Sequence, residues 1–266
     1  MATRDVYTHG HHDSVLRSHR WRTAENSAGY LLPHLSPGMS LLDVGCGPGT
    51  ITLDLARRVT PGRVVGVDLS TDVIEQAARA ARTEGLEGVE LVVGDFHELD
   101  QGGFDVVHAH QVLQHLSDPV GSLRAMRRLA RPGGIVAVRD SDYPAMLWAP
   151  AYEALERWRE VYLAVTRHNR AHADAGRHLL RWAHEAGLVD ARYSTSTWTY
   201  ATGADRSWWG ELWAERSTAS AFAEQAVDYG IATQGDLADI AAAWREWAAE
   251  PHGVFVVVHG EAIAGA

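Results

Sequence analysis

Lysine is absent from this sequence: all 24 basic residues counted as lysine or arginine are arginines. The chain therefore cannot form a Walker-type phosphate loop of the usual kind, a Schiff-base nucleophile or a lysine general base. Its 34 acidic residues give a formal net charge of −10. We expect no basic face that would bind a phosphate backbone, and thus no nucleic-acid partner.

Cysteine and long apolar runs are also scarce. The single cysteine, Cys46, cannot form an intrachain disulfide, so a reducing compartment is expected. No apolar run approaches the ~20 residues of a membrane span, and residues 1–14 lack the apolar core of a signal peptide. We expect a cytoplasmic protein with no membrane partner. The sequence leaves open whether copies of the chain form a homo-oligomer.

The segment 39–50, MSLLDVGCGPGT, predicts a nucleotide-binding turn. Its apolar half is typical of a parallel strand that is buried on both faces. The glycines that follow are Gly45, Gly47 and Gly49. They allow the backbone to turn sharply and to approach a ligand more closely than a Cβ would permit. A helix expected to start near Thr50 would direct its free N–H groups at a carboxylate or phosphate.

The spacing of these glycines differs from the dinucleotide fingerprint G-x-G-x-x-G. The third glycine comes one residue early, and Thr50 occupies the expected position. The difference weakens the interpretation of the chain as a nicotinamide oxidoreductase, which we keep as a minor alternative.

Polar residues follow the next three predicted strands. The strand RVVGVD ends at Asp68, VELVVGD ends at the Gly94-Asp95-Phe96 segment, and FDVVHAH ends at His110-Gln111. Open parallel sheets bind their ligands at the carboxyl ends of the strands. The sequence therefore predicts one ligand site along this edge.

Five segments carry a family resemblance, and they span about residues 39 to 140: LLDVGCGPGT, VVGVDLS, VVGDFHEL, FDVVHAHQVLQHLSDP and RLARPGGIVAVRD. In this order and spacing they resemble the successive motifs of the class I S-adenosylmethionine-dependent methyltransferases. Within that class the chain is similar to the ubiquinone/menaquinone-biosynthesis type and its small-molecule relatives.

The resemblance implies an α/β fold, a doubly wound, Rossmann-like, seven-stranded sheet with an antiparallel last strand, plus N-terminal helices and a helical lid insertion. Alternating apolar and amphipathic segments agree with it. We expect residues 1–38 to close the site, 39–142 to bind the cofactor, and 143–266 to hold the acceptor-side helices and the last two strands. The helices outside the central part are expected over 13–18, 23–32, 151–170, 174–186, 205–229 and 234–249.

The resemblance also assigns the donor site, with S-adenosylmethionine as cofactor and S-adenosylhomocysteine as product. Asp43 would orient the glycine turn and the donor's amino group. Asp68 would hold the ribose hydroxyls. Asp95 would contact the adenine amino group, with Phe96 and Leu69 beside the ring. Gly94, His110 and Gln111 complete the predicted cofactor residues.

Tryptophan is unevenly distributed: Trp21 precedes the central motifs, and the other nine follow them. Large rings often only pack helices on a sheet. However, Trp208, Trp209 and Trp213 fall where this class inserts a lid, which favours an apolar or aromatic acceptor. The further predicted acceptor residues are Tyr7, Arg22 and Asp142. Arg20 and Arg22 could neutralise the donor's methionyl carboxylate or an acidic acceptor, or they could only face solvent.

With no lysine available, a general base would be a histidine, and the predicted set is His9, His11, His12 and His115. His108 and His110 share one face of a strand, but no third ligand follows at a suitable spacing, so no metal site is expected.

The sequence thus predicts methyl transfer from S-adenosylmethionine to a small, apolar or aromatic metabolite by in-line displacement. The alternative is a protein that binds S-adenosylmethionine for a structural or electrostatic purpose without methylating anything.

Overall fold

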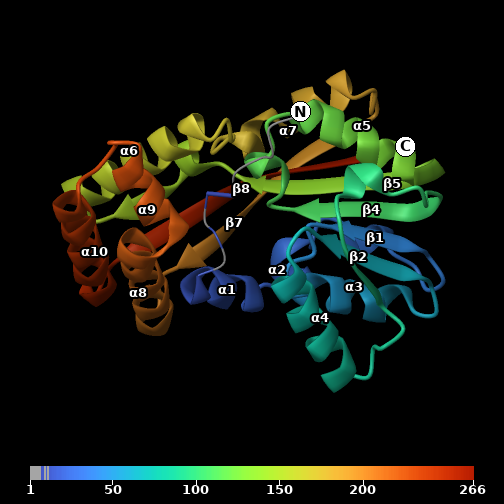
Figure 1. Ribbon diagram of the computed structural model, residues 1–266, viewed down its shortest axis with the longest axis horizontal. Helices are drawn as coiled ribbons and strands as arrows, with labels where there is room; N and C mark the ends of the chain where they lie inside the picture. Colours follow the sequence, from blue (N-terminus) through green and yellow to red (C-terminus); the bar gives the residue numbers. More distant parts are fainter. Residues whose placement is uncertain (1–6, 9, 11) are drawn as a thin grey trace.

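The computed structural model describes residues 7, 8, 10 and 12–266. One sheet of eight strands organises them (Figure 1), in the order β3-β2-β1-β4-β5-β8-β6, with β7 on the other edge of β8. The strands are β1 (Leu41–Val44), β2 (Val64–Asp68), β3 (Glu90–Val93), β4 (Phe104–His110), β5 (Ala130–Ser141), β6 (Leu147–Ala149), β7 (Arg192–Tyr200) and β8 (Val254–Gly265).

The α-helices are α1 (Asp13–Arg20), α2 (Ala24–Ser27), α3 (Thr50–Val59), α4 (Thr71–Thr83), α5 (Pro119–Leu129), α6 (Glu153–His168), α7 (Ala175–Glu185), α8 (Gly203–Ala219), α9 (Ala221–Asp228) and α10 (Gln234–Ala249). Four single-turn 3-10 helices are η1 (Leu32–His34), η2 (Phe96–Glu98), η3 (Leu113–His115) and η4 (Tyr143–Ala145). Within the described residues, no helix is both long and apolar enough to cross a bilayer.

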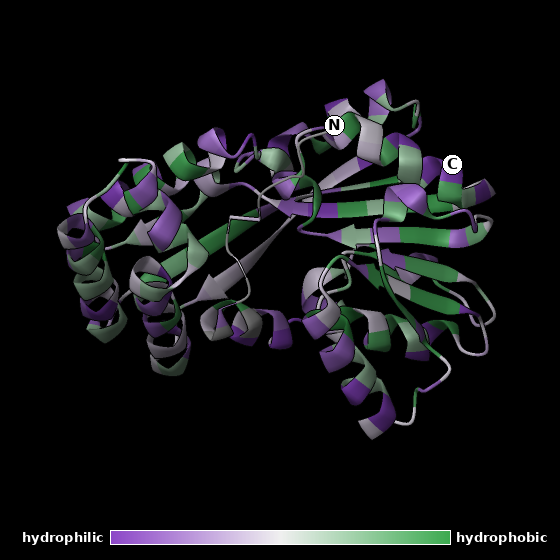
Figure 2. Ribbon diagram, viewed as in Figure 1, coloured by the Kyte–Doolittle hydropathy of each residue, from purple (hydrophilic) through white to green (hydrophobic). Residues whose placement is uncertain are grey.

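Helices cover both faces of the sheet because successive apolar residues of the parallel strands point in opposite directions. Leu41 packs against α2 and α3, whereas its neighbour Leu42 packs beneath α5 and α7. The same alternation recurs in β2 and β4, and Figure 2 shows these central strands largely in the colours of hydrophobic residues. This arrangement confirms the predicted doubly wound α/β fold.

The direction of the last strand is confirmed as well, since β8 pairs with β5 in the antiparallel sense. The predicted number of strands is wrong: the sheet has eight strands, not seven. The additional strand, β6, pairs with Val254–Val256 of β8 and continues the edge that β5 occupies further along. The turn η4, which contains Pro144, separates β5 from β6, because a proline cannot donate to a strand ladder.

One predicted helix is shorter than expected, and another is divided in two. The helix expected over 23–32 ends at Ser27, shortly before Gly29, a residue of low helix propensity. The helix expected over 205–229 divides into α8 and α9 at Ser220, whose backbone is extended. There the Ser220 hydroxyl donates to the carbonyl of Arg216, a local bond that competes with helix continuation.

An aromatic core joins α6, α8 and α10 at one end of the molecule, on the left in Figure 1. Trp158 of α6 is fully buried and meets Trp213 and Trp244 edge to face, with ring centroids 4.6 and 5.0 Å apart. Such pairs add to the free energy gained from burying the rings. The three helices also pack on the sheet, because the Phe255 ring of β8 belongs to the same cluster and lies 5.3 Å from the Trp244 ring.

A close backbone contact joins α7 to β8. A Cβ on Gly260 would lie 2.0 Å from the carbonyl oxygen of Gly176, and a Cβ on Gly176 would lie 2.8 Å from the amide nitrogen of Gly260. Both neighbouring atoms belong to the backbone, so no side-chain rotation can relieve a clash. Two glycines are thus required where the helix crosses the strand.

We predict that Gly260→Ala lowers the free energy of unfolding by about 3 kcal/mol or more, because the new methyl group displaces the start of α7. Urea unfolding measures the effect. The matched control is Gly88→Ala, where a Cβ meets no atom within 4 Å and the backbone is compatible with alanine. Equal stability of the two variants would contradict the proposed clash.

Candidate active site

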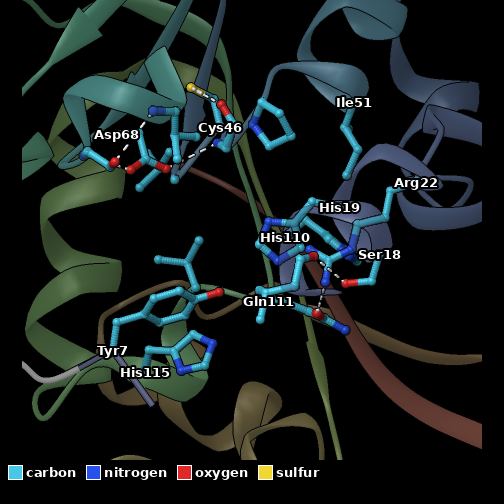
Figure 3. Close-up of a pocket in the computed structure, with 18 of the residues that line it drawn as sticks. Tyr7, Ser18, His19, Arg22, Cys46, Ile51, Asp68, His110, Gln111 and His115 are labelled. Carbon is cyan, nitrogen blue, oxygen red and sulfur yellow. Dashed lines mark hydrogen bonds between the residues drawn. The ribbon is translucent and has the colours of Figure 1, made fainter. Parts of the chain in front are cut away.

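A cavity of about 1030 Å³ opens at the carboxyl ends of β1, β2 and β4, and it extends to α1 and α8. Figure 3 shows part of its lining, with Asp68 and Cys46 at one end of the view and Tyr7 with His115 at the other. Its volume suits a cofactor together with a second small molecule. The cavity lies where the sequence predicts a ligand site.

The glycine turn forms one wall. Gly45, Gly47 and Gly49 have φ values of 64°, 58° and 85°, which are conformations that favour glycine. A Cβ on Gly47 would meet only Nδ1 of His19, at 3.9 Å, so the backbone here faces open space in the cavity. Gly49 does not line the cavity but forms the N-cap of α3 and packs against α4.

Asp43 lies under this turn and is 3% exposed. One carboxylate oxygen accepts a hydrogen bond from the Thr52 hydroxyl at 2.5 Å, and the other is 2.8 Å from Nδ1 of His108. The carboxylate thereby joins β1 to α3 and β4. His108, which the sequence analysis considered for a metal pair, is instead the buried partner of Asp43.

Asp68 presents its carboxylate at the end of β2. Its two oxygens accept hydrogen bonds from the backbone amides of Gly47 (3.1 Å) and Ser70 (3.0 Å). An ionised carboxylate can accept about four hydrogen bonds, so each oxygen retains capacity for a ligand hydroxyl. The observed geometry fits the ribose-binding role that was predicted for this residue.

The predicted adenine site lies next to it. Leu69, Gly94, Asp95 and Phe96 all line the cavity. Leu69 is 53% exposed and offers an apolar surface to a planar ring. Asp95 caps η2 by accepting from the amide of His97 at 2.9 Å.

His110 and Gln111 form the floor between the two ends of the cavity. Gln111 has φ 55°, a strained conformation for this residue. Its side-chain oxygen accepts from Arg22 at 2.6 Å and its amide nitrogen donates to Ser141 at 2.7 Å. Burial lowers the pKa of His110 well below its usual value, so the ring is neutral.

Aromatic side chains surround the other end of the cavity. Trp208, Trp209 and Trp213 all line it. Trp208 is half-buried, whereas the other two belong to the aromatic core as well. Trp209 stacks on Tyr200 with ring centroids 4.2 Å apart. The two interpretations of this cluster, core and pocket wall, therefore both apply.

The predicted histidines separate into three groups. His9 and His11 lie outside the described residues. His12 is the N-cap of α1 and does not line the cavity. His115 lines the cavity and meets Tyr7 edge to face at 4.8 Å. Burial, with the charge of Arg22 as a smaller cause, lowers the pKa of His115 to about 3.

The tautomer of His115 follows from its neighbour Gln114. The Gln114 side-chain oxygen accepts from the amide of Ser141 at 3.1 Å, so its amide nitrogen must face Nε2 of His115, 3.0 Å away. That nitrogen of the neutral imidazole is thus an acceptor, and the ring proton is on Nδ1.

Asp142 does not line the cavity, contrary to expectation. Its carboxylate forms a bidentate ion pair with Arg177, with both distances 2.6 Å, and caps η4. The end of β5 therefore directs this side chain toward α7 and away from the cavity.

Several residues that line the cavity are not among those predicted from the sequence, including His19, Tyr143, Trp198, Tyr200 and Arg216. One signal was available: residues 209, 213 and 216 follow one another at helical spacings of four and three, which places Arg216 on the same face of α8 as the two tryptophans. Strand residues such as Trp198 gave no comparable signal.

Comparison with known proteins identifies the family. The model of a family described as methyltransferase domain matches residues 35–187, more than half of the chain. An uncharacterized methyltransferase of Schizosaccharomyces pombe is 32% identical over 271 residues, which cover 97% of this chain and 95% of that protein. A demethylmenaquinone methyltransferase of Lactococcus lactis is 32% identical over 120 residues, 44% of this chain and 48% of that enzyme.

Solved structures agree in fold. A candidate methyltransferase of Bacillus halodurans has a TM-score of 0.58 at 18% identity and covers 89% of this chain and 97% of its own. A phosphoethanolamine N-methyltransferase of Haemonchus contortus, solved with S-adenosylhomocysteine, has a TM-score of 0.50 at 18% identity, over 85% of this chain and 49% of its own. The chain belongs to the methyltransferase family, in the class that uses S-adenosylmethionine as methyl donor.

Proposed function

We propose that this enzyme transfers a methyl group from S-adenosylmethionine to a small, apolar or aromatic acceptor by in-line displacement. The observation that carries the proposal is one continuous cavity with two chemically different ends. Glycines and carboxylates line the end at the strand edge, and aromatic rings line the end below α8. Two molecules can therefore meet in it.

The donor end fits S-adenosylmethionine, which supplies an activated methyl group on a sulfonium. Gly47 would leave room for the methionyl portion, since its backbone faces open space. The Asp68 carboxylate would accept from the ribose hydroxyls, and Asp95 would contact the adenine, beside Leu69 and Phe96. Gly45, Gly94 and the buried Asp43 would maintain the shape of this end.

The acceptor end supports catalysis by alignment and exclusion of water. Because the donor is already activated, the enzyme's main contribution would be to hold the acceptor in line with the methyl group. Rings of α8 and β7 surround this space and reduce its access to solvent. Trp208 contributes the least buried of the three α8 rings and would contact the acceptor directly.

The role of His115 depends on the acceptor. Its Nε2 already accepts from Gln114, so the ring must release this hydrogen bond before it can take a proton. A pKa of about 3 also makes it a weak base. We propose that His115 and Tyr7 position an acceptor that needs little or no deprotonation.

Incubation with methyl-labelled S-adenosylmethionine and a fractionated metabolite extract tests the activity. We expect label to move into a small organic product, accompanied by formation of S-adenosylhomocysteine. Tight donor binding without label transfer to any fraction would instead support a protein that uses the donor only structurally or electrostatically.

We predict that Asp68→Ala weakens S-adenosylhomocysteine binding by about 1.5–3 kcal/mol, the usual value for hydrogen bonds to a charged group. Isothermal titration calorimetry measures the change. Asp100→Ala, at an exposed position outside the cavity lining, is the matched control and should bind as wild type does. Unchanged affinity in a folded Asp68→Ala variant would refute the donor assignment.

Trp208→Ala and Trp213→Ala should separate acceptor binding from packing. We expect Trp208→Ala to raise the KM for the acceptor while donor affinity and melting temperature stay near wild type. Trp213 is 1% exposed, so its truncation should cost about 3–5 kcal/mol of stability. Thermal melts and both affinities are measured for each variant. A large stability loss for Trp208→Ala, with no selective effect on KM, would show that this ring only packs.

A further inference from the structure

Two arginines line the cavity. Arg22 follows α1 and is half-buried, and Arg216 of α8 is 4% exposed. Figure 3 shows Arg22 beside Ser18, Gln111 and His110. A guanidinium that is removed from water usually has an anionic partner, because an uncompensated buried charge is costly.

Neither arginine forms an ion pair with any residue that the structure describes. Nη2 of Arg216 donates to the Ser18 hydroxyl at 2.5 Å and to the Ser14 carbonyl at 3.1 Å, and its Nε has no partner in the described part of the chain. Arg22 donates to the neutral side chain of Gln111. Arg139, another buried arginine, differs in having the carboxylate of Glu261 at 3.3 Å.

The groups around the two arginines do not supply a negative charge. Burial raises the pKa of Tyr7 to about 12 and also raises the pKa of Tyr143, so both phenols are neutral. Burial is likewise the main cause that lowers the pKa of Arg22, to about 10, and that lowers the pKa of Arg216. Each arginine remains charged near neutral pH, and the carboxylates of the cavity lie at its donor end.

The position of Arg22 associates it with the donor. The Thr50 hydroxyl at the start of α3 donates to the carbonyl of His19 at 3.1 Å, which holds the end of α1 against the glycine turn. S-adenosylmethionine has a single carboxylate, on its methionyl portion. That carboxylate can compensate Arg22, which leaves Arg216 without an anion.

Arg216 lies deeper among aromatic rings. Its guanidinium carbon is 5.1 Å from the centroid of the Trp213 ring, and two bonds to α1 fix its orientation. A planar guanidinium in such a setting presents its remaining N–H groups to a carboxylate and an aromatic wall to the rest of the ligand.

We propose that the methyl acceptor is a small aromatic or apolar carboxylic acid whose carboxylate binds Arg216. The inference rests on the proposed function of the cavity and specifies its substrate class. The acceptor's apolar part would lie against Trp208, Trp209 and Tyr200. Neutral analogues of the same shape would leave the charge of Arg216 uncompensated and bind less tightly.

The test compares benzoate with benzamide, two probes of the same shape and different charge. Each is titrated into protein saturated with S-adenosylhomocysteine, and binding is followed by calorimetry. We expect benzoate to bind about tenfold or more tightly than benzamide, and Arg216→Gln to remove this preference. Arg206→Gln is the matched control, because Arg206 is a buried arginine of the same helix outside the cavity lining.

The outcomes separate this inference from the proposed function. If wild type does not bind S-adenosylhomocysteine, the proposed function fails. If the cofactor binds but benzoate is not preferred over benzamide, or neither binds up to its solubility limit, the carboxylate site is refuted. A loss of cofactor affinity in Arg216→Gln equal to its loss of benzoate affinity would assign Arg216 to the donor instead. If Arg216→Gln does not fold, the comparison of benzoate with benzamide in wild type and in Arg216→Lys, which keeps the charge, still tests the carboxylate site.

Discussion

The buried carboxylate of Asp43 connects the elements on which the cavity depends. It lies at the end of β1 and bonds Thr52 in α3 and His108 in β4. The glycine turn leaves the sheet between these contacts, so its three positive-φ residues are held over a fixed base. The two bonds of the Asp43 carboxylate thus tie the start of the turn to the helix and the strand beside it. The buried His108 is needed for the same reason, because an unpaired carboxylate in this position would be costly.

Acidic and basic side chains occupy different parts of the cavity, and the net charge of the chain does not indicate this arrangement. The chain has a formal net charge of −10, yet two arginines and no carboxylate are found where the aromatic rings converge. The carboxylates collect at the strand ends, where hydroxyl and amino groups of a nucleoside would need acceptors. A surplus of acid over the whole chain therefore says little about the charge of the ligand, which depends on the few groups inside.

Much of the fold and of the donor end could be predicted because their signals are local. The strand, the glycine turn and the helix after it occupy consecutive residues, and Asp68 and Asp95 each directly follow an apolar strand. The predictions from the sequence are wrong where a side-chain contact in the folded protein overrides the local sequence pattern. The Ser220 hydroxyl bonds the backbone carbonyl of Arg216, and the helix ends there although the helical sequence pattern continues. Asp142 follows β5 as expected, but its carboxylate pairs with Arg177 of α7. The extra strand β6 is too short to give a periodic signal.

The sequence by itself determined the family, the order of the central strands and helices, and most residues at the strand-edge end of the cavity, since each rests on residues that are neighbours in the chain. Only the tertiary structure decided the acceptor end. Arg216 bonds Ser14 across 202 positions, and Trp198 bonds the carbonyl of Asn26 across 172. Contacts of this kind depend on how α1 packs against α8 and how α2 packs against β7, and no periodicity within one segment encodes them. The anion site proposed at Arg216 depends on folding, which buries this guanidinium and places the carboxylates of the cavity elsewhere.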